Sequence, residues 1–241
     1  MKKILGPMRR AIQQFHMIEN GDRIAVGLSG GKDSIALLAA LARYQKFAPV
    51  QFDLEAVTID AGLEGMDFSP LIAYCHDIHI PYTILKTSIA TVVFDIRNES
   101  NPCSLCARMR RGALHNLCCK LNCNKLALGH HADDAVETFF LSLFFEGRIN
   151  TFQPVTFLDR KQITLIRPLI FVNEKDIIYD SECQTLPIIG STCPADGFTK
   201  REDVKNFIAK MRADIPDLNK KVLSAIENPH PFIPWTKNLK K

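Results

Sequence analysis

The 241-residue sequence contains no apolar run near the roughly 18 residues that a membrane-spanning helix requires. Its basic start, MKKILGPMRRAIQQF, is not typical of a secretory signal, because Arg9 and Arg10 interrupt any apolar core. These two absences predict a cytoplasmic protein with no membrane partner. In a reducing compartment, eight cysteines argue against a disulfide framework and favour metal, cluster or redox chemistry.

Internal repeats and low-complexity tracts are also missing, and the length favours one large domain with extensions. The formal net charge of +4 is too small to identify a nucleic-acid partner. Its distribution is more informative, because residues 1–10 carry four Lys or Arg and no acid, and residues 200–241 carry ten against five acids. Such basic ends could gather and attract phosphate backbones, or they could form ordinary solvated helices.

Apolar periodicity alternates between the two regular structures along most of the chain. Strands are predicted at 23–29, 52–60, 81–86, 125–130 and within 162–170, and helices at 8–18, 34–45, 69–78, 104–121, 133–147 and 173–183. This alternation predicts an α/β fold with a doubly wound, mostly parallel five-stranded sheet and short helical extensions at both ends. The expected parts are an amphipathic helix (1–20), a catalytic domain (21–198) and a basic extension and tail (199–241).

The segment SGGKDS, residues 29–34, joins the first predicted strand directly to the following helix. Adjacent glycines allow a sharp turn, and amide groups at a helix N-terminus favour an anion. The loop is neither the longer Walker sequence nor G-x-G-x-x-G. A glycine turn with a helix cap is the simpler alternative. We predict phosphate binding by the whole loop, which comprises Ser29, Gly30, Gly31, Lys32, Asp33 and Ser34.

Polar residues follow two other predicted strands, where ligands of a doubly wound sheet bind. The second strand ends at Asp60, and the fourth leads into GHHADD at 129–134. Gly129 would permit a close approach, and His130 supplies a polar group. Asp133 or Asp134 could hold Mg²⁺, although either could instead cap the following helix. Arg167, at the end of the fifth strand, is a weaker candidate for a phosphate contact.

The stretch NPCSLCARMRR, residues 101–111, places Cys103 and Cys106 at the start of a long helix. A four-cysteine zinc site is disfavoured, because no second C-x-x-C occurs. The remaining isolated candidate is Cys193, which lies in the loop TCPADG. Three cysteines without a fourth ligand suggest an iron–sulfur cluster with one open iron. The other cysteines are expected to be structural.

Four runs together resemble the bacterial tRNA 2-thiocytidine synthetase family, which belongs to the PP-loop ATP-pyrophosphatase superfamily and has an adenine nucleotide alpha hydrolase-like fold. They span roughly residues 9–195 in family order. The runs are RRAIQQFHMIENGDRIAVGLSGGKDS (9–34), PCSLCARMRRGAL (102–114), LALGHHADDAVETFFLSLFF (126–145) and IRPLIFVNEKDI (166–177).

The resemblance implies an enzyme that uses ATP and Mg²⁺ to adenylate the C2 oxygen of cytidine 32 in tRNA and then replaces that oxygen with sulfur. It implies a [4Fe-4S] cluster on Cys103, Cys106 and Cys193, and catalytic roles for these cysteines with Lys32 and Asp33. Its implied partners are tRNA and a cysteine desulfurase or another sulfur donor. Candidate tRNA contacts are Arg108, Arg110, Arg111 and Arg167. Solvent-facing helix charge is the alternative for the three helical arginines.

One departure from the family pattern concerns the third cluster ligand. The family usually shows C-x-x-C after the P-I-I run, whereas here PII is followed by GSTCP with Cys193 alone. The alternatives are persulfide chemistry on Cys103 or Cys193, thiolation of another tRNA pyrimidine, a tRNA lysidine synthetase-like ligase or a PP-loop amidotransferase. A non-catalytic, zinc-containing RNA-binding protein would leave SGGKDS unexplained. Whether the chain forms a homodimer is open.

Overall fold

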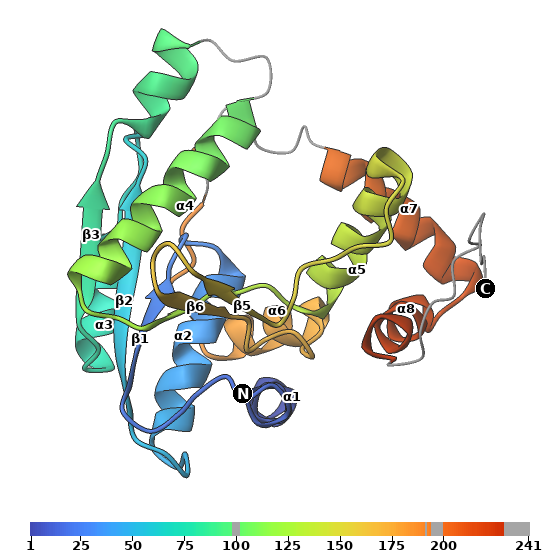
Figure 1. The fold of residues 1–241 in the computed structure, drawn as a ribbon, viewed down its shortest axis with the longest axis horizontal. Helices are drawn as coiled ribbons and strands as arrows, with labels where there is room; N and C mark the ends of the chain where they lie inside the picture. Colours follow the sequence, from blue (N-terminus) through green and yellow to red (C-terminus); the bar gives the residue numbers. More distant parts are fainter. Residues whose placement is uncertain (98–101, 191, 194–199, 229–241) are drawn as a thin grey trace, which may run out of the picture.

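The core of the protein is a twisted sheet flanked by helices on both faces (Figure 1). The computed structural model describes residues 1–97, 102–190, 192–193 and 200–228. Its six strands run in the order β3-β2-β1-β4-β6-β5. They are β1 (Asp22–Gly27), β2 (Phe52–Asp60), β3 (Tyr82–Lys86), β4 (Lys125–Ala127), β5 (Val155–Leu158) and β6 (Ile163–Ile166). The chain leaves β1 for β2 on one side and returns to β4 on the other. The carboxyl ends of β1 and β4 therefore form the switch point at which such sheets bind ligands.

The α/β class and the doubly wound, mostly parallel sheet are confirmed, but the expected strand number was wrong. The additional strand, β5, pairs antiparallel with β6 and forms an edge of the sheet. The helices are α1 (Lys2–Gln14), α2 (Lys32–Gln45), α3 (Ser69–Asp77), α4 (Pro102–Lys120), α5 (Ala132–Leu141), α6 (Glu174–Cys183), α7 (Lys200–Asp214) and α8 (Leu218–Glu227), with the short π-helices η1 (Thr91–Ile96) and η2 (Ser142–Glu146). The first helix begins six residues earlier than predicted and includes Pro7.

Each face of the sheet buries its own apolar core because neighbouring strand residues point to opposite faces. Ile24 and Val26 of β1 join the core beneath α1, α2, α3 and α6. Ala25, between them, belongs to the second core beneath η1 and α4. The cysteine-bearing helix α4 and the helix that follows the phosphate loop, α2, therefore lie on opposite faces of the sheet, and residues beyond the strand ends can meet between them.

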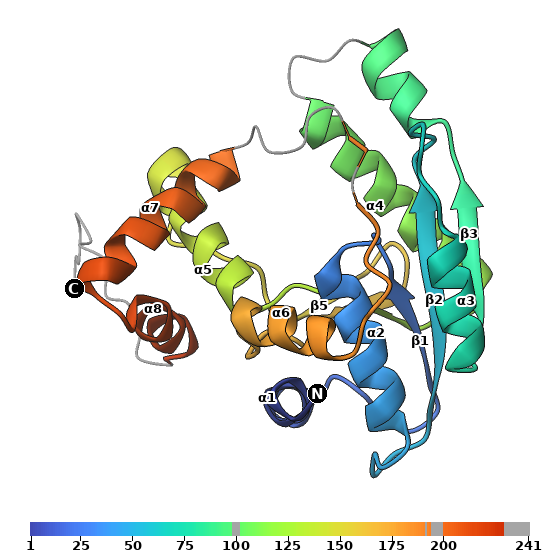
Figure 2. The same ribbon diagram turned by 180° about the vertical axis from the view of Figure 1, so that it is seen from behind.

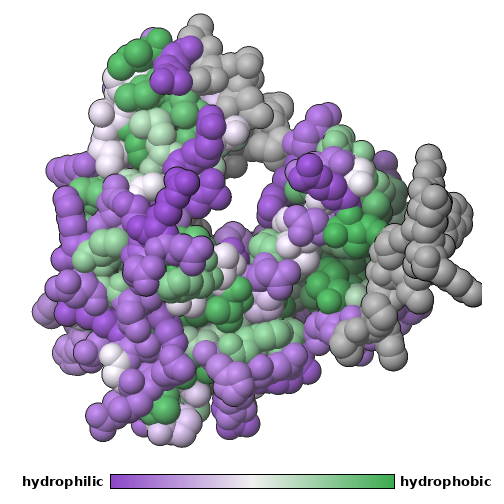
Figure 3. Space-filling model, viewed as in Figure 1, coloured by the Kyte–Doolittle hydropathy of each residue, from purple (hydrophilic) through white to green (hydrophobic). Residues whose placement is uncertain are grey.

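The last two described helices pack outside the sheet, against α5 (Figures 1 and 2). Val204 and Ile208 of α7 form a small core with Val136 of α5, and all three are nearly fully buried. Helices α5 and α7 stand across from α4, and the space-filling view shows the molecule hollowed between these parts (Figure 3). None of the described helices is long and apolar enough to cross a membrane.

Candidate active site

The phosphate loop turns sharply between β1 and α2. Gly30 has φ +90°, a left-handed conformation that favours glycine, and its carbonyl accepts a hydrogen bond from the Ile189 amide at 2.9 Å. The hydroxyls of Ser29 and Ser34 lie 3.3 Å apart, and the Ser29 hydroxyl accepts the Gly31 amide at 3.3 Å. Helix α2 begins at Lys32, so its first amides face the loop and favour an anion there.

Gly129 lets the end of β4 approach the start of α2. A Cβ at this position would stand 3.0 Å from the Asp33 carbonyl carbon and oxygen and from the Ser34 nitrogen. These atoms belong to the backbone of the first turn of α2 and cannot turn aside as a side chain would. The predicted close approach of Gly129 is therefore a property of the fold, and it fixes the place of the phosphate loop relative to β4.

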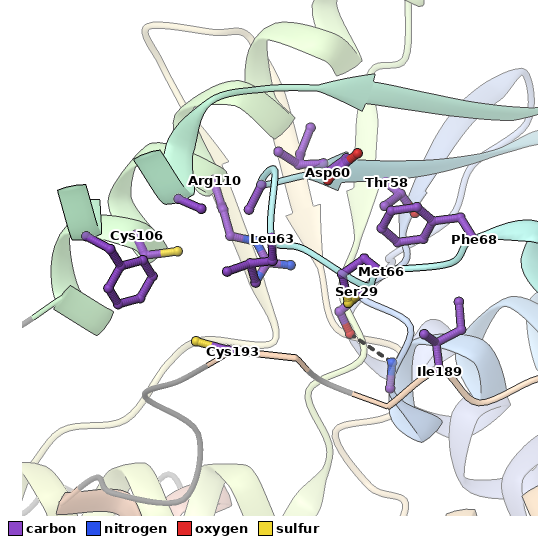
Figure 4. Close-up of a pocket in the computed structure, with 15 residues that line it drawn as sticks. Ser29, Thr58, Asp60, Leu63, Met66, Phe68, Cys106, Arg110, Ile189 and Cys193 are labelled. Atoms are coloured by element: carbon purple, nitrogen blue, oxygen red, sulfur yellow. Dashed lines mark hydrogen bonds between the residues drawn. The ribbon is translucent and has the colours of Figure 1, made fainter. Parts of the chain in front are cut away.

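A cavity of about 350 Å³ opens beside the phosphate loop (Figure 4). Ser29, Gly31 and Asp60 line its polar part, and Cys106 and Cys193 line the same cavity. The apolar part of its wall consists of Ile59, Ala61, Leu63, Met66, Phe68, Ala90, Phe94 and Ile189. A cavity with a large apolar wall and a few convergent polar groups is typical of a small-molecule site.

The cysteines approach this cavity from two segments. Cys106 lies on α4 and Cys193 on the loop after α6; both are half-buried, whereas Cys103, one turn before Cys106, is exposed. Arg110 lies one turn after Cys106 and its side chain reaches into the cavity (Figure 4). Burial raises the pKa of the Cys106 thiol, the charge of Arg110 opposes this, and the neighbouring Cys193 and Cys103 side chains add to it. Without a metal, Cys106 therefore holds its proton.

Lys32 and Asp33, the two charged residues of the loop, contact each other and α6. The Lys32 ammonium lies 3.2 Å from the Asp33 carboxylate and donates to Glu174 Oε1 at 2.8 Å. Burial works against the charge of Lys32, but the hydrogen bond to Glu174 and the negative charge of Asp33 raise its pKa. Asp33 Oδ1 is buried and accepts no hydrogen bond from the described residues, although the Lys32 ammonium lies 3.2 Å and His131 Nε2 lies 3.6 Å from it. A buried carboxylate oxygen of this kind can accept a metal ion.

The structure places the two predicted magnesium ligands in other contacts. Asp133 Oδ1 accepts hydrogen bonds from Arg212 and Asn219, both at 2.7 Å, and Oδ2 accepts the Glu174 amide at 2.7 Å. Asp133 therefore anchors α7, α8 and the start of α6, and its role as a magnesium ligand stays a prediction.

Asp134 is engaged on both carboxylate oxygens as well. Its Oδ2 accepts the His131 amide at 3.0 Å in the capping box of α5, and its Oδ1 pairs with Arg201 at 3.0 Å. The partly buried helix cap thus explains Asp134 better than the phosphate site does, and Asp33 is the better candidate for a metal.

Two further predicted contacts lie away from the cavity. Arg167 is buried, and one guanidinium nitrogen donates to the Gln153 carbonyl and to the Thr156 hydroxyl. Its guanidinium carbon also lies 5.0 Å from the centre of the Phe152 ring, on which His130 packs at 5.0 Å. Arg167 therefore stabilises the β5–β6 edge, and its assignment as a tRNA contact stays a prediction that these contacts do not support. Burial lowers the pKa of His130 to about 4, so the imidazole is neutral near pH 7.

The three arginines of α4 do not act together. Only Arg110 lines the cavity, whereas Arg108 and Arg111 are exposed on other parts of the helix surface. Glu174, which the sequence reasoning missed, is the acid nearest Lys32. The sequence did contain a signal for Glu174. It is a carboxylate at the first position of the helix that follows the fifth predicted strand, and that helix starts at the same edge of the sheet as the phosphate loop.

Glu137 of α5 gives a testable pH dependence of stability. Burial raises its pKa to about 7, while Lys205 and Arg201 oppose the shift. Below about pH 4.5 both folded and unfolded chains are protonated here. Between pH 4.5 and 7 the unfolded chain loses this proton first, so the stability supplied by Glu137 falls as pH rises.

We expect the free energy of unfolding of Glu137→Gln, relative to wild type, to increase by about 3 kcal/mol from pH 4.5 to 8, at ~1.4 kcal/mol per pKa unit. Urea titrations at several pH values measure this; a constant difference would contradict it.

The glycine turn at the end of β1, the helix that begins at Lys32 and the cavity beyond them define a nucleotide-binding protein of the PP-loop class. Residues 5–186 match the PP-loop domain family. Two curated relatives are tRNA-cytidine(32) 2-sulfurtransferases. That of Syntrophotalea carbinolica is 38% identical over 96% of this chain and 89% of its own length. That of Geobacter sulfurreducens is 38% identical over 95% of this chain and 91% of its own length.

A solved structure supports the same fold. The U34-tRNA thiolase NcsA of Methanococcus maripaludis, determined with its [4Fe-4S] cluster, aligns with a TM-score of 0.76 at 24% identity, over 93% of this chain and 78% of that chain. The chain belongs to the tRNA-cytidine(32) 2-sulfurtransferase family, as its sequence similarity over nearly the full lengths of both relatives establishes.

Proposed function

We propose that this protein is an ATP-dependent sulfurtransferase that replaces the C2 oxygen of cytidine 32 in tRNA with sulfur. One observation carries the proposal beyond family membership: Cys106 and Cys193 line the same cavity as Ser29 and Gly31 of the phosphate loop. One base could then be activated by the nucleotide and receive sulfur in the same cavity, without moving between two sites. The lysidine synthetase, amidotransferase and zinc-protein alternatives leave this juxtaposition unused.

ATP fits the loop by the chemistry of its donors. The first amides of α2, the Ser29 hydroxyl and the Lys32 ammonium would hold the phosphates, and the apolar wall of the cavity would receive the base. Mg²⁺ fits Asp33, whose buried Oδ1 accepts no hydrogen bond from the described residues and has the Lys32 ammonium as its neighbour at 3.2 Å.

An iron–sulfur cluster fits the cysteines better than a single metal ion does. No three His, Cys, Asp or Glu side chains of the described residues lie close enough together to share one ion. A cluster is larger and holds its thiolates farther apart, and Cys106 and Cys193 reach one cavity with Cys103 one turn away. When bound, a cluster with three protein ligands supplies one open iron for an exogenous sulfur. Because thiolates are the ligands, Cys106 must lose its proton as the cluster is loaded.

The reaction balances in two displacements. The C2 oxygen of the cytidine attacks the α-phosphorus of ATP, and pyrophosphate leaves. Sulfur at the sulfide level then attacks C2, a C–S bond forms, the C–O bond breaks and AMP leaves with the oxygen. Arg110 supplies a cation between the cysteines and the phosphate loop, where it can stabilise the negative charge that both displacements develop.

The substrate and partner assignments follow from the family. tRNA is the proposed substrate, with the exposed Arg108 and Arg111 as candidate phosphate contacts. A cysteine desulfurase is the proposed source of sulfur. A homodimer and a cytoplasmic location stay predictions.

Nucleoside analysis of tRNA tests this function. Cells that lack the gene should contain no 2-thiocytidine, and expression of the wild-type chain should restore it at position 32. Anaerobically purified protein should be brown and hold about four irons per chain. Restoration of a thiolated nucleoside at another position would overturn the assigned substrate, and a colourless protein with one zinc would overturn the cluster.

A further inference from the structure

Helix α7 lies outside the matched PP-loop domain. Its basic side chains contact acidic residues at the first turns of α5 and α6. Arg201 pairs with Asp134 at 3.0 Å, and Arg212 pairs with Asp133 at 2.7 Å. Lys205 of the same helix is a third cation directed at this acidic region, where it lies near Glu137 and Glu174. The C-terminal extension therefore adds positive charge to an acidic region in which Lys32 of the catalytic domain pairs only with Asp33 and Glu174 among the described acids.

Glu174 connects this charge to the phosphate loop. Its Oε1 lies 2.8 Å from the Lys32 ammonium and 3.9 Å from the Lys205 ammonium. The second distance is an ion-pair distance but too long for a hydrogen bond. The Lys205 ammonium is also 3.8 Å from Glu137 Oε1, so it lies between two carboxylates and is hydrogen-bonded to neither. Lys32 therefore holds Glu174 when no nucleotide is bound, and Lys205 is its second neighbour.

Phosphates in the loop would compete with Glu174 for Lys32. A lysine is a compact point charge, and Lys32 would turn its ammonium toward the larger negative charge. Glu174 would not follow, because the phosphates repel its carboxylate and its backbone amide is bound to Asp133 at 2.7 Å at the start of α6. Burial opposes the charge of Glu174, and it is the hydrogen bond and charge of Lys32, with the charge of Lys205, that hold its pKa below the usual value. Loss of Lys32 would leave a half-buried carboxylate unpaired next to the phosphates, which is unfavourable.

We propose that Lys205 takes over the Glu174 carboxylate when Lys32 turns to the nucleotide phosphates, so that α7 completes the ATP site from outside the PP-loop domain. Glu174 and Lys205 are positioning residues in this exchange. The inference rests on the proposed function, because it requires that the loop bind ATP. It explains why Lys205 lies within reach of Glu174 yet makes no hydrogen bond to it, and why α7 is anchored firmly on α5 by Val204 and Ile208.

Equilibrium titration of ATP into the full chain tests the proposal without reference to catalysis. Lys205→Gln should weaken ATP binding by about 5- to 20-fold, the lower part of the range usual for coupled sites, and Lys205→Arg should restore most of it. Lys210→Gln is the matched control, because it removes the same charge from an exposed position of the same helix. Thermal unfolding of each variant checks that the chain is folded.

A double-mutant cycle separates the exchange from general electrostatics. In the Glu174→Gln background there is no carboxylate to take over, so Lys205→Gln should change ATP affinity by less than twofold. An undiminished effect in that background, or an equal effect of Lys205→Gln and Lys210→Gln, would overturn the proposed exchange alone. Failure of the wild-type chain to bind ATP would overturn the proposed function and this inference with it.

Discussion

Replacement of Cys106 by alanine is expected to abolish 2-thiocytidine formation while ATP binding stays within about twofold of wild type. Cys106 lines the cavity and faces the side from which Cys193 approaches, so its thiolate is placed to hold a cluster at the cavity wall. The phosphate loop is built from other segments, and its hydrogen bonds among Ser29, Gly31 and Ser34 do not involve α4. Loss of a cluster ligand therefore removes sulfur delivery and leaves nucleotide binding intact.

Iron content, the absorbance of the anaerobic protein, ATP affinity and thiolated nucleosides should be measured on the same preparations. Cys119→Ala is the matched control, because Cys119 is an exposed thiol of the same helix that lies near the Lys161 carbonyl rather than the cavity. Cys103→Ala and Cys193→Ala should behave as Cys106→Ala does. Retention of the iron with loss of thiolation in Cys193→Ala would assign Cys193 to sulfur transfer instead of cluster binding.

Much of the fold could be predicted because helices and strands that pack on an apolar core show periodic apolar residues in the sequence. The strand predicted at 52–60 has the same bounds as β2, which is buried along nearly all its length. β5 lacks this signal, since it has four residues, forms the sheet edge and exposes Phe157. Its antiparallel pairing with β6 depends on the turn between them rather than on a long apolar run.

The candidate site could be predicted only as far as it depends on local sequence. Gly30 and Gly129 could be singled out because each satisfies a steric demand of the backbone: Gly30 has a positive φ, and a Cβ at Gly129 would crowd the start of α2. The contacts of Asp133 could not be predicted, because its partners Arg212 and Asn219 lie 79 and 86 residues later, on the extension. The contacts of Arg167 could not be predicted for a related reason: its acceptors belong to β5, which was missed, and to the segment before it.

Replacement of Gly129 by alanine is expected to weaken ATP binding tenfold or more and to destabilise the protein by about 1–3 kcal/mol, the usual result of overpacking a close contact. The new methyl group would stand 3.0 Å from the backbone of Asp33 and Ser34. Because those atoms belong to the first turn of α2, relief of the contact must move the helix start that carries Lys32. The phosphate-binding amides, the Asp33 carboxylate and the Lys32–Glu174 contact would all shift together.

Gly112→Ala is the matched control, because a Cβ at Gly112 meets nothing within 4 Å in the middle of α4. Alanine there should leave ATP affinity unchanged and raise stability by up to about 1 kcal/mol, since glycine is the poorer helix former. ATP titration and urea denaturation of both variants measure the contrast. Normal ATP affinity in Gly129→Ala would mean that the nucleotide does not depend on the start of α2, and the phosphate site would then have to be sought elsewhere along the cavity. A loss of ATP affinity in Gly129→Ala but not in Gly112→Ala would show that nucleotide binding depends on the close approach of β4 to α2. The SGGKDS sequence by itself does not predict this dependence.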